Sequence, residues 1–305
     1  MEQNSSDRPK RVLITGCSSG FGLLTAVGAA KAGCQVIATL RNPNKDKSLR
    51  SALENAGLSA TIDILDTTSP DSVAKIAEKY DPVDILVNNA GILIAGSFLD
   101  QTDAEARLIF ETNYFGPLNL TKALAPSMIK RRSGRIINIA SLAGLVGHPF
   151  NAAYAASKHA LIGFSRSIRV ELAPFNIDVI SIEPGYHRTE IIRNNANLSE
   201  NFYNPKSPMF EYNKAFLRAM FKYILPRAGD PDKVADKIVK IMQLPKPKSH
   251  YRIGSDARFA LAAQWLGLTG LVERKVIRLI RQCRKTERRN TEDRKQKKEL
   301  RINDD

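Results

Sequence analysis

The sequence contains little cysteine. Only Cys17, Cys34 and Cys283 occur among 305 residues, and no two of them lie at a paired spacing. Scattered cysteines are typical of a protein from a reducing compartment, and they predict neither a disulfide framework nor a cysteine-based metal site. We therefore expect no metal centre in this chain.

The chain also lacks the hydrophobic segments that direct proteins into or across membranes. Residues 1–10 are polar and carry no apolar stretch of the kind found in a secretory signal. No run of about 18 apolar residues occurs, so the sequence predicts no membrane-spanning helix. These absences favour a cytoplasmic location, with attachment to a membrane surface as the alternative.

Positive charge is present in excess. The chain has 46 lysines and arginines against 31 acidic residues, which gives a formal net charge of +15. Much of the basic excess lies between Arg274 and Arg301, and such a segment could attract anionic lipid or nucleic acid, or simply be a solvated extension. No aromatic residue is interleaved with these basic residues, so the stacking surface of a nucleic-acid site is missing and we expect no specific nucleic acid.

The order of apolar and amphipathic segments predicts an α/β fold. Short apolar, β-branched segments alternate with segments of helical pattern, for example 69–80 and 103–130. Such alternation is typical of a parallel, doubly wound sheet of the Rossmann type. We expect one domain over residues 9–255, followed by an apolar helix and a basic tail over 256–305. The predicted strands cover residues 12–15, 36–40, 60–65, 85–88, 135–139 and 179–183.

A glycine-rich turn follows the first predicted strand. It reads Thr15-Gly-Cys-Ser-Ser-Gly-Phe-Gly22, and a helical pattern begins directly after it. A turn of this kind presents the unpaired N–H groups of a helix N-terminus to a phosphate. Gly16 allows the tight turn, Gly20 lets the backbone approach a pyrophosphate, and Gly22 lets the helix pack closely on the strand. The turn therefore predicts a nucleotide site.

A tyrosine and a lysine lie four residues apart in another segment of helical pattern. Tyr154 and Lys158 would share one face of that helix. A lysine beside a phenol favours the phenolate and lowers the pKa of the phenol, which suits proton exchange with an alcohol oxygen near neutral pH. Taken alone, the pair is also compatible with an ordinary surface helix.

Several short motifs, taken in order, resemble the short-chain dehydrogenase/reductase family. Most of them follow predicted strands, at the edge of the sheet where open α/β folds bind ligands. The resemblance implies an NAD(P)-dependent oxidoreductase that acts on CH–OH groups. The motifs are Thr15-Gly16-x-x-x-Gly20-x-Gly22, Asp63, Asn88-Asn89-Ala90-Gly91, Asn113, Ser141, Tyr154-x-x-x-Lys158, and Pro184-Gly185 with Thr189.

The resemblance also implies the roles of individual residues. Tyr154 would donate or accept the proton, and Ser141 would hold the substrate oxygen. Lys158 would bind the nicotinamide ribose, and Asn113 would join it in a water-linked proton relay. Asp63, with the backbone of Ile64, would contact the adenine. The expected cofactor contacts are Gly16, Ser18, Ser19, Gly20, Phe21, Gly22, Arg41, Asp63, Ile64, Asn89, Ala90, Gly91, Asn113, Tyr154, Lys158, Pro184, Gly185 and Thr189.

The end of the second predicted strand bears on the choice of cofactor. An acidic residue there would accept hydrogen bonds from the ribose 2′-hydroxyl of NAD. The sequence instead has Thr39-Leu40-Arg41, and a guanidinium suits a 2′-phosphate. Arg41, helped by Ser18 or Ser19, therefore favours NADP, with NAD as the alternative.

The segment 186–226 is expected to form a variable lid over the active site. It is rich in aromatic residues, which predicts either a largely apolar pocket or ordinary packing within the lid. The glycine turn and residues 38–41 resemble the hydroxysteroid and retinol dehydrogenase branch of the family, and this resemblance implies a bulky lipophilic alcohol or ketone as substrate. Tyr186-His187-Arg188 departs from that branch, and His148 is expected to border the pocket.

Three further expectations concern the whole protein. The resemblance implies a homo-oligomer. The apolar segment 259–272 is compatible with a core helix, a dimer contact or a peripheral membrane anchor. A non-catalytic nucleotide sensor or scaffold with the same fold is the alternative to an enzyme, but such proteins usually lose the tyrosine or the lysine that this chain keeps.

Overall fold

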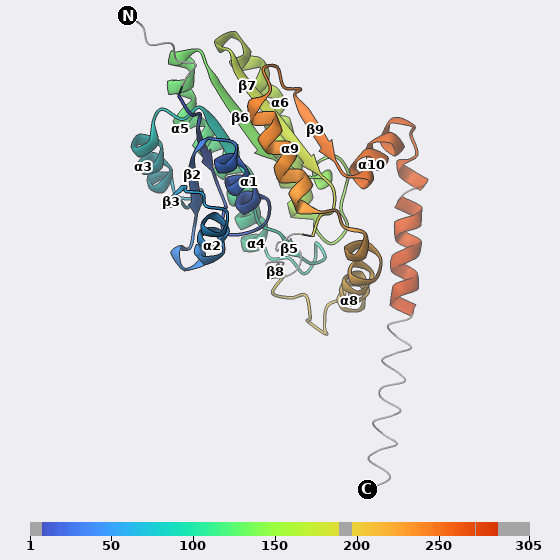
Figure 1. Ribbon diagram of the computed structural model, residues 1–305. Helices are drawn as coiled ribbons and strands as arrows, with labels where there is room; N and C mark the ends of the chain where they lie inside the picture. The colour runs from blue at the N-terminus through green and yellow to red at the C-terminus, as the bar shows by residue number, and fades with distance from the viewer. Residues whose placement is uncertain (1–7, 189–196, 272, 286–305) are drawn as a thin grey trace, which may run out of the picture.

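A seven-stranded parallel sheet forms the centre of the protein (Figure 1). The computed structural model describes residues 8–188, 197–271 and 273–285. The strands run in the order β3-β2-β1-β4-β6-β7-β9, and a separate parallel pair joins β5 to β8. The strands are β1 Arg11–Ile14, β2 Gln35–Leu40, β3 Thr61–Ile64, β4 Ile85–Asn88, β5 Ile94–Ala95, β6 Gly134–Ile139, β7 Ile177–Pro184, β8 Asn197–Leu198 and β9 His250–Ile253.

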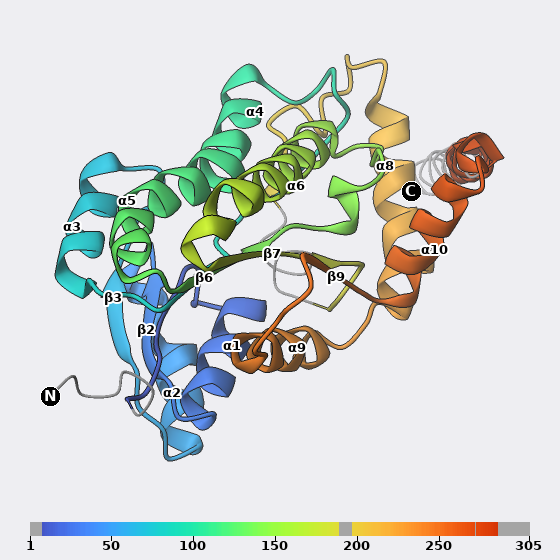
Figure 2. The same ribbon diagram turned by 90° about the horizontal axis from the view of Figure 1, so that it is seen from above.

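Helices cover both faces of this sheet. Seen from above, α1, α2 and α9 lie on one side, and α3, α4, α5 and α6 lie on the other (Figure 2). The helices are α1 Gly20–Lys31, α2 Lys47–Asn55, α3 Pro70–Tyr80, α4 Asp103–Phe110, α5 Gly116–Arg131, α6 Ala152–Leu172, α8 Phe210–Ala219, α9 Pro231–Gln243 and α10 Ser255–Trp265. The predicted doubly wound α/β fold is confirmed.

The alternation of side chains along the strands produces two apolar cores. In β1, Val12 and Ile14 pack with α1 and α9 on one face, whereas Leu13 packs with α3 and α5 on the other. Successive side chains of a strand point to opposite faces, so a sheet covered on both sides requires a continuous apolar run. This requirement explains the unbroken runs Val12-Leu-Ile14 in β1 and Ile85-Leu-Val87 in β4.

The six predicted strands are present, with ends that differ by at most two residues from the expectation. Strand β9 was not predicted, because His250-Tyr-Arg-Ile253 contains no apolar run and its alternation of polar and apolar residues spans only four positions. It pairs with β7 at the edge of the sheet, with Ser181 opposite His250 and Pro184 opposite Ile253. Tertiary pairing therefore determines this strand.

The predicted helix 103–130 is interrupted. A π-helical turn, η2 Glu111–Phe115, separates α4 from α5. Single π turns inside α-helices are rare and often mark functional sites. This turn carries Asn113, whose side chain is fully buried.

The C-terminal part lies against the substrate lid. The helical residues 273–285 follow α10, and Cys283 and Leu279 pack against Ala215 and Ala219 of the lid helix α8. Arg284 donates a hydrogen bond of 2.5 Å to the hydroxyl of Tyr212. In the described part of the chain, no helix is both long enough and apolar enough to cross a membrane.

Candidate active site

The glycine turn is fixed to the loop after β4 by Thr15 and Asn89. Asn89 Nδ2 donates to the carbonyl oxygens of Thr15 and Gly16, at 2.8 and 3.2 Å. The hydroxyl of Thr15 accepts from the backbone N–H of Asn89 and of Ala90. Gly16 has a φ of 72°, a left-handed conformation that glycine adopts without a steric penalty. These hydrogen bonds hold the carboxyl ends of β1 and β4 together.

Helix α1 packs tightly on this turn. A β-carbon at Gly22 would lie 2.3 Å from the carbonyl oxygen of Gly16, closer than two non-bonded atoms can approach. The N-cap residue Ser19 makes no side-chain capping bond, and the first helical turn contains no acidic residue. The N–H groups at this end of α1 are therefore available to an anion, and the local charge of the helix end favours one.

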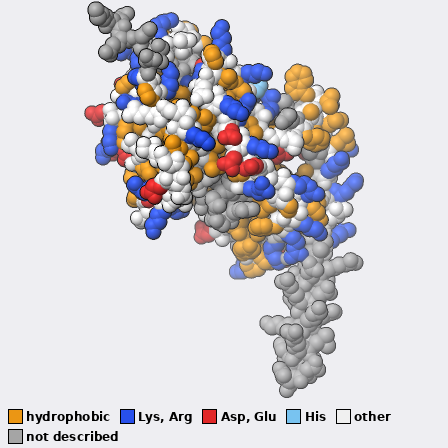
Figure 3. Space-filling model, viewed as in Figure 1, with side chains coloured by type: hydrophobic (Ala, Val, Ile, Leu, Met, Phe, Trp, Pro, Cys, Tyr) orange, Lys and Arg blue, Asp and Glu red, His pale blue; other side chains and the backbone are white. Residues whose placement is uncertain are grey.

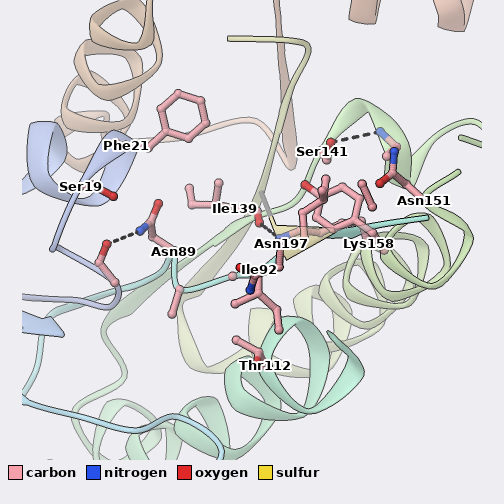
Figure 4. A pocket seen from close by; sticks show the side chains of 18 of the residues that line it. Ser19, Phe21, Asn89, Ile92, Thr112, Ile139, Ser141, Asn151, Lys158 and Asn197 are labelled. Carbon is pink, nitrogen blue, oxygen red and sulfur yellow. Dashed lines mark hydrogen bonds between the residues drawn. The ribbon is translucent and has the colours of Figure 1, made fainter. Parts of the chain in front are cut away.

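One cavity of about 620 Å³ connects this helix end to Tyr154. Ser19, Phe21 and Asn89 lie at one end of the cavity, and Ser141, Asn151 and Lys158 lie at the other (Figure 4). The expected contacts that line it are Gly16, Ser18, Ser19, Gly20, Phe21, Arg41, Asn89, Ala90, Gly91, Ser141, Tyr154, Lys158, Pro184 and Gly185. Gly22 lies behind the turn, and Thr189 lies outside the described residues.

Asp63 and Ile64 do not line this cavity, so their expected place at the adenine must be corrected. The carboxylate of Asp63 accepts hydrogen bonds from Tyr80, at 2.6 Å, and from Lys79, at 2.7 Å. Asp66, two residues beyond the end of β3, lines the cavity instead. The expectation for Asp63 came from the resemblance, whereas Asp63 lies within β3 and the chain reaches the cavity only after that strand ends at Ile64.

Basic and polar side chains surround the cavity at the end of β2. Arg41, Asn42 and Lys45 all line it, and no carboxylate lies at the end of this strand. Arg41 is exposed, so its guanidinium is accessible to a ligand. Two cations and an amide at this place suit a phosphate better than a ribose hydroxyl. The residues present therefore fit a dinucleotide with an additional phosphate on this side.

Tyr154 and Lys158 come from one face of α6, as their spacing predicts. Lys158 Nζ lies 5.8 Å from the centre of the Tyr154 ring and donates a hydrogen bond of 2.8 Å to the carbonyl of Ile139. Burial lowers the pKa of Lys158 to about 8. Burial raises the pKa of Tyr154, and a hydrogen bond with Ser141 opposes this rise. Desolvation outweighs the hydrogen bond, so the pKa of Tyr154 is raised in this arrangement, whereas the sequence predicted a lowered pKa.

Asn113 lies behind these residues. Its amide oxygen accepts a hydrogen bond of 2.8 Å from the N–H of Ile92, and its Nδ2 donates to Ile92 O and to Ser157 Oγ. A β-carbon at Gly91 would lie 3.2 Å from Asn113 Oδ1 and 3.5 Å from Lys158 Nζ. Asn113 and Lys158 thus both lie close to Gly91, although Asn113 itself does not line the cavity.

A cluster of three polar side chains, His148, Asn151 and Tyr186, lies beside Tyr154. The ring of His148 contacts the hydroxyl of Tyr186 through Nε2, and its Nδ1 lies 3.0 Å from Asn151 Nδ2. Burial lowers the pKa of His148 and raises that of Tyr186, and the neighbouring Tyr154 and Asp256 raise the latter further. Asn151 was missed by the sequence analysis. Its position immediately before α6 is its only sequence signal.

The lid is less aromatic at the cavity than the sequence suggests. Of its aromatic residues, Tyr186, Phe216 and Phe221 line the cavity. Phe202 is fully buried in the lid itself, and Tyr203 is exposed. The other apolar lining comes from residues without aromatic rings. Among them are Leu93, Leu142, Ala143, Leu198, Leu217, Met220 and Leu225.

The fold and the site together define a nucleotide-dependent α/β enzyme with its cofactor cleft at the carboxyl edge of a parallel sheet. The family model for the short chain dehydrogenases matches residues 10–199. The chain belongs to the short-chain dehydrogenase/reductase family, as its motifs predict, and it is an NAD(P)-dependent oxidoreductase.

Similar proteins come from bacteria and animals. The chain is 39% identical over 261 residues to an uncharacterized oxidoreductase of Bacillus subtilis, covering 83% of this chain and 91% of that protein. It is 37% identical over 247 residues to human retinol dehydrogenase 8, covering 78% and 79% of the two chains. A crystal structure of a short-chain dehydrogenase from Streptomyces avermitilis has a TM-score of 0.75 at 34% identity, covering 90% and 98%. The predicted resemblance to the retinol and hydroxysteroid branch is confirmed.

Proposed function

We propose that this protein transfers a hydride between NADP(H) and the carbon of a lipophilic alcohol or ketone, with Tyr154 as the proton donor and acceptor. The observation that carries the proposal is the single cavity that joins the N-terminus of α1 to Tyr154, Ser141 and Lys158. A nicotinamide cofactor held along the glycine turn would supply the hydride chemistry. The remaining steps belong to side chains of this protein.

The proton pathway follows from the contacts around Tyr154. Ser141 shares a hydrogen bond with the phenol and faces the same cavity, so both hydroxyls can bind one substrate oxygen. In reduction, Tyr154 gives its proton to that oxygen. The positive charge of Lys158 stabilises the phenolate that forms. Asn113 holds the backbone of Ile92 near Lys158 by two hydrogen bonds. A water molecule bound between them would pass protons to Lys158.

Removing the phenolic hydroxyl tests this assignment. Tyr154→Phe should lower kcat by roughly 10²–10⁴-fold, the usual contribution of a general acid or base. The affinity for NADPH, measured by fluorescence titration, should change little because the glycine turn is untouched. A Tyr154→Phe protein that kept full activity would contradict the proposal, and Tyr114→Phe on the neighbouring π turn serves as a matched control.

NADP is the cofactor that the end of β2 favours. Arg41, Asn42 and Lys45 line the cavity where the adenosine ribose of the cofactor would lie. Two similar structures support this choice, an actinorhodin polyketide ketoreductase with NADPH and a metagenomic short-chain oxidoreductase with NADP, at 29% and 27% identity.

The cofactor preference is tested by Arg41→Ala. We expect the KM for NADPH to rise at least tenfold, because a charge-assisted pair with a phosphate is lost, about 1.5–3 kcal/mol. The KM for NADH should be nearly unchanged. Arg50→Ala, on the neighbouring helix α2, is the control, since Arg50 pairs with Asp46 rather than lining the cavity. Equal effects on both cofactors would contradict the preference.

A lipophilic substrate is supported by the lid side of the cavity. Leu142, Phe216, Met220, Phe221 and Leu225 give it apolar walls. Relatives with named substrates fit this chemistry, namely retinol dehydrogenase 8 and a 3-ketodihydrosphingosine reductase of Bacteroides thetaiotaomicron, which is 34% identical over 268 residues. An NADPH-consumption screen over steroids, retinoids, long-chain ketones and 3-oxoacyl thioesters tests the substrate class. Turnover restricted to small polar carbonyls would contradict it.

The wider arrangement of the protein is also proposed here. We expect a homo-oligomer in the cytoplasm, with peripheral membrane contact through the C-terminal region. No observation favours the non-catalytic alternative, because Asn113, Ser141, Tyr154 and Lys158 are all retained and lie close together.

A further inference from the structure

Apolar side chains are exposed together at the C-terminal end of the described chain. Trp265 is 86% exposed and Leu266 is 70% exposed, at the end of α10 and in the turn after it. Leu268 and Leu271 continue the exposed apolar surface. Figure 3 shows hydrophobic side chains gathered over α10 and its turn. We call Trp265, Leu266, Leu268 and Leu271 the apolar shelf. Contiguous exposed apolar groups of this kind mark a protein or membrane contact.

Basic residues follow the apolar shelf directly. Residues 274–285 contain six basic side chains and no acidic one, whereas residues 286–305 contain seven basic and six acidic residues. The net positive charge of this region therefore lies in the helical residues 273–285. Glu273 is the single acid between Trp265 and Lys285.

Four of these basic residues form one stripe. Arg274, Arg278, Arg281 and Lys285 are spaced by four, three and four residues, which places them on one face of a helix. All four are exposed. Leu279 and Cys283 occupy the opposite face and pack against α8. The fold therefore holds the basic stripe outward and fixes it beside the apolar shelf.

We propose that the apolar shelf and the basic stripe form a docking surface for an anionic lipid bilayer. Tryptophan and leucine insert at the level of the headgroups, and lysine and arginine attract anionic lipids, so one surface uses both features. A two-fold contact with a second copy would bring the same basic stripe close to itself. Nucleic acid would use the charge but leave the apolar shelf in water.

Docking would also place the lid at the membrane. Phe221 lines the cavity and is exposed, and it lies in the π turn, η5 Met220–Ile224, that follows α8. The residues that carry the stripe pack on α8 through Cys283 and Leu279. Lipophilic substrate could therefore enter from the bilayer past Phe221. This consequence rests on the proposed function, whereas lipid binding itself does not.

The test is co-sedimentation of the full-length protein with vesicles, without any catalytic readout. Vesicles of phosphatidylcholine alone are compared with vesicles that contain about one third phosphatidylserine. We expect binding to the anionic vesicles and weak binding to the neutral ones. Raising the salt from about 0.1 M to about 1 M should weaken it, because the screening length falls from about 10 Å to about 3 Å.

Two variants separate the contributions. Trp265→Ser with Leu266→Ser, and separately Arg274→Glu with Arg278→Glu and Arg281→Glu, should each reduce the partition coefficient at least roughly tenfold. Val170→Ser, which removes an equally exposed side chain from α6, and Lys31→Glu with Lys233→Glu should leave binding unchanged. Circular dichroism verifies that each variant is folded.

Three results would overturn the proposal. These are equal binding to neutral and anionic vesicles, no binding to either, and binding that survives both sets of substitutions. If vesicles do not bind but Trp265→Ser with Leu266→Ser dissociates an oligomer in light scattering, the surface belongs to a second copy. Activity on a water-soluble ketone separates this outcome from failure of the proposed reaction, since it depends on Tyr154 and not on lipid.

Discussion

Lys158 is the residue whose chemistry depends most on burial. Its amine is almost completely enclosed, and among the described residues it donates one hydrogen bond, to the carbonyl of Ile139. Desolvation disfavours the ammonium and lowers the pKa of the group to about 8. The residue is therefore charged below about pH 8 and loses its charge above it, well below the ordinary value of 10.5. A charge that assists Tyr154 is then present only on the acidic side of that value.

The pH profile of ketone reduction should show this titration. We expect kcat/KM for NADPH, which reports the free enzyme, to fall as the pH rises through about 8. In Lys158→Arg the guanidinium stays charged. The pH at which kcat/KM begins to fall should therefore be higher by more than one unit, whatever the maximum value of kcat/KM in the variant. Stopped-flow assays with saturating ketone measure both profiles. A fall of kcat/KM at the same pH in both proteins would show that Lys158 is not the group that titrates.

At the scale of elements, strand β9 is held to the sheet by a buried charge as well as by its ladder. Arg252 Nε lies 3.2 Å from the carboxylate of Glu183 on β7. The side chain of Glu183 is fully buried, and its oxygens accept no well-formed hydrogen bond among the described residues. A buried carboxylate without its cation is costly, so β9 supplies the partner that β7 needs.

Removing that partner should destabilise the fold. We expect Arg252→Ala to lower the free energy of unfolding by about 3–5 kcal/mol, because Glu183 is left charged and unpaired. Adding Glu183→Gln to Arg252→Ala should recover part of this loss, since the amide carries no charge. Urea denaturation measures both. A double variant less stable than Arg252→Ala would show that the ion pair is not the cause.

At the scale of the whole molecule, the C-terminal helical residues support the lid. Cys283 covers Ala215 and Ala219, and Arg284 both stacks on Tyr212, 4.5 Å from the ring centre, and bonds to its hydroxyl. Asp256 of α10 accepts a hydrogen bond of 2.7 Å from the N–H of Tyr186 at the cavity. The C-terminal segment is thus connected to the substrate side of the site, while the cofactor side is built from residues before it.

Truncation should separate the two sides. A protein that ends at Gly270 loses the cover of α8, and its KM for a lipophilic ketone should rise severalfold while its KM for NADPH stays constant. Truncation after Lys285 keeps Cys283 and Arg284 and is the matched control. Steady-state kinetics with each substrate varied in turn provides the measurement. Equal changes in both KM values would contradict this division of the site.

Much of the site was predictable because its residues are local in sequence. The glycine turn, Tyr154 and Lys158 each lie within one turn or one helix, so spacing fixes their geometry. Asp63 was expected at the cavity from the resemblance, but it lies within β3, and Asp66, beyond the end of that strand, lines the cavity instead. Asn151 gave no distinct signal, since its partner His148 becomes meaningful only beside Tyr186.

The sequence by itself determined the family and the doubly wound sheet, and it predicted Asn113, Ser141, Tyr154 and Lys158 as the catalytic residues, because apolar patterns and short-range spacing are properties of neighbours along the chain. Only the tertiary structure decided the pairing of β9, the π turn that places Asn113, and the raised pKa of Tyr154. It also decided which face of residues 273–285 points outward. These features depend on burial and on contacts between segments far apart in sequence, and burial is what turns a charge or a hydroxyl into a group with a shifted pKa.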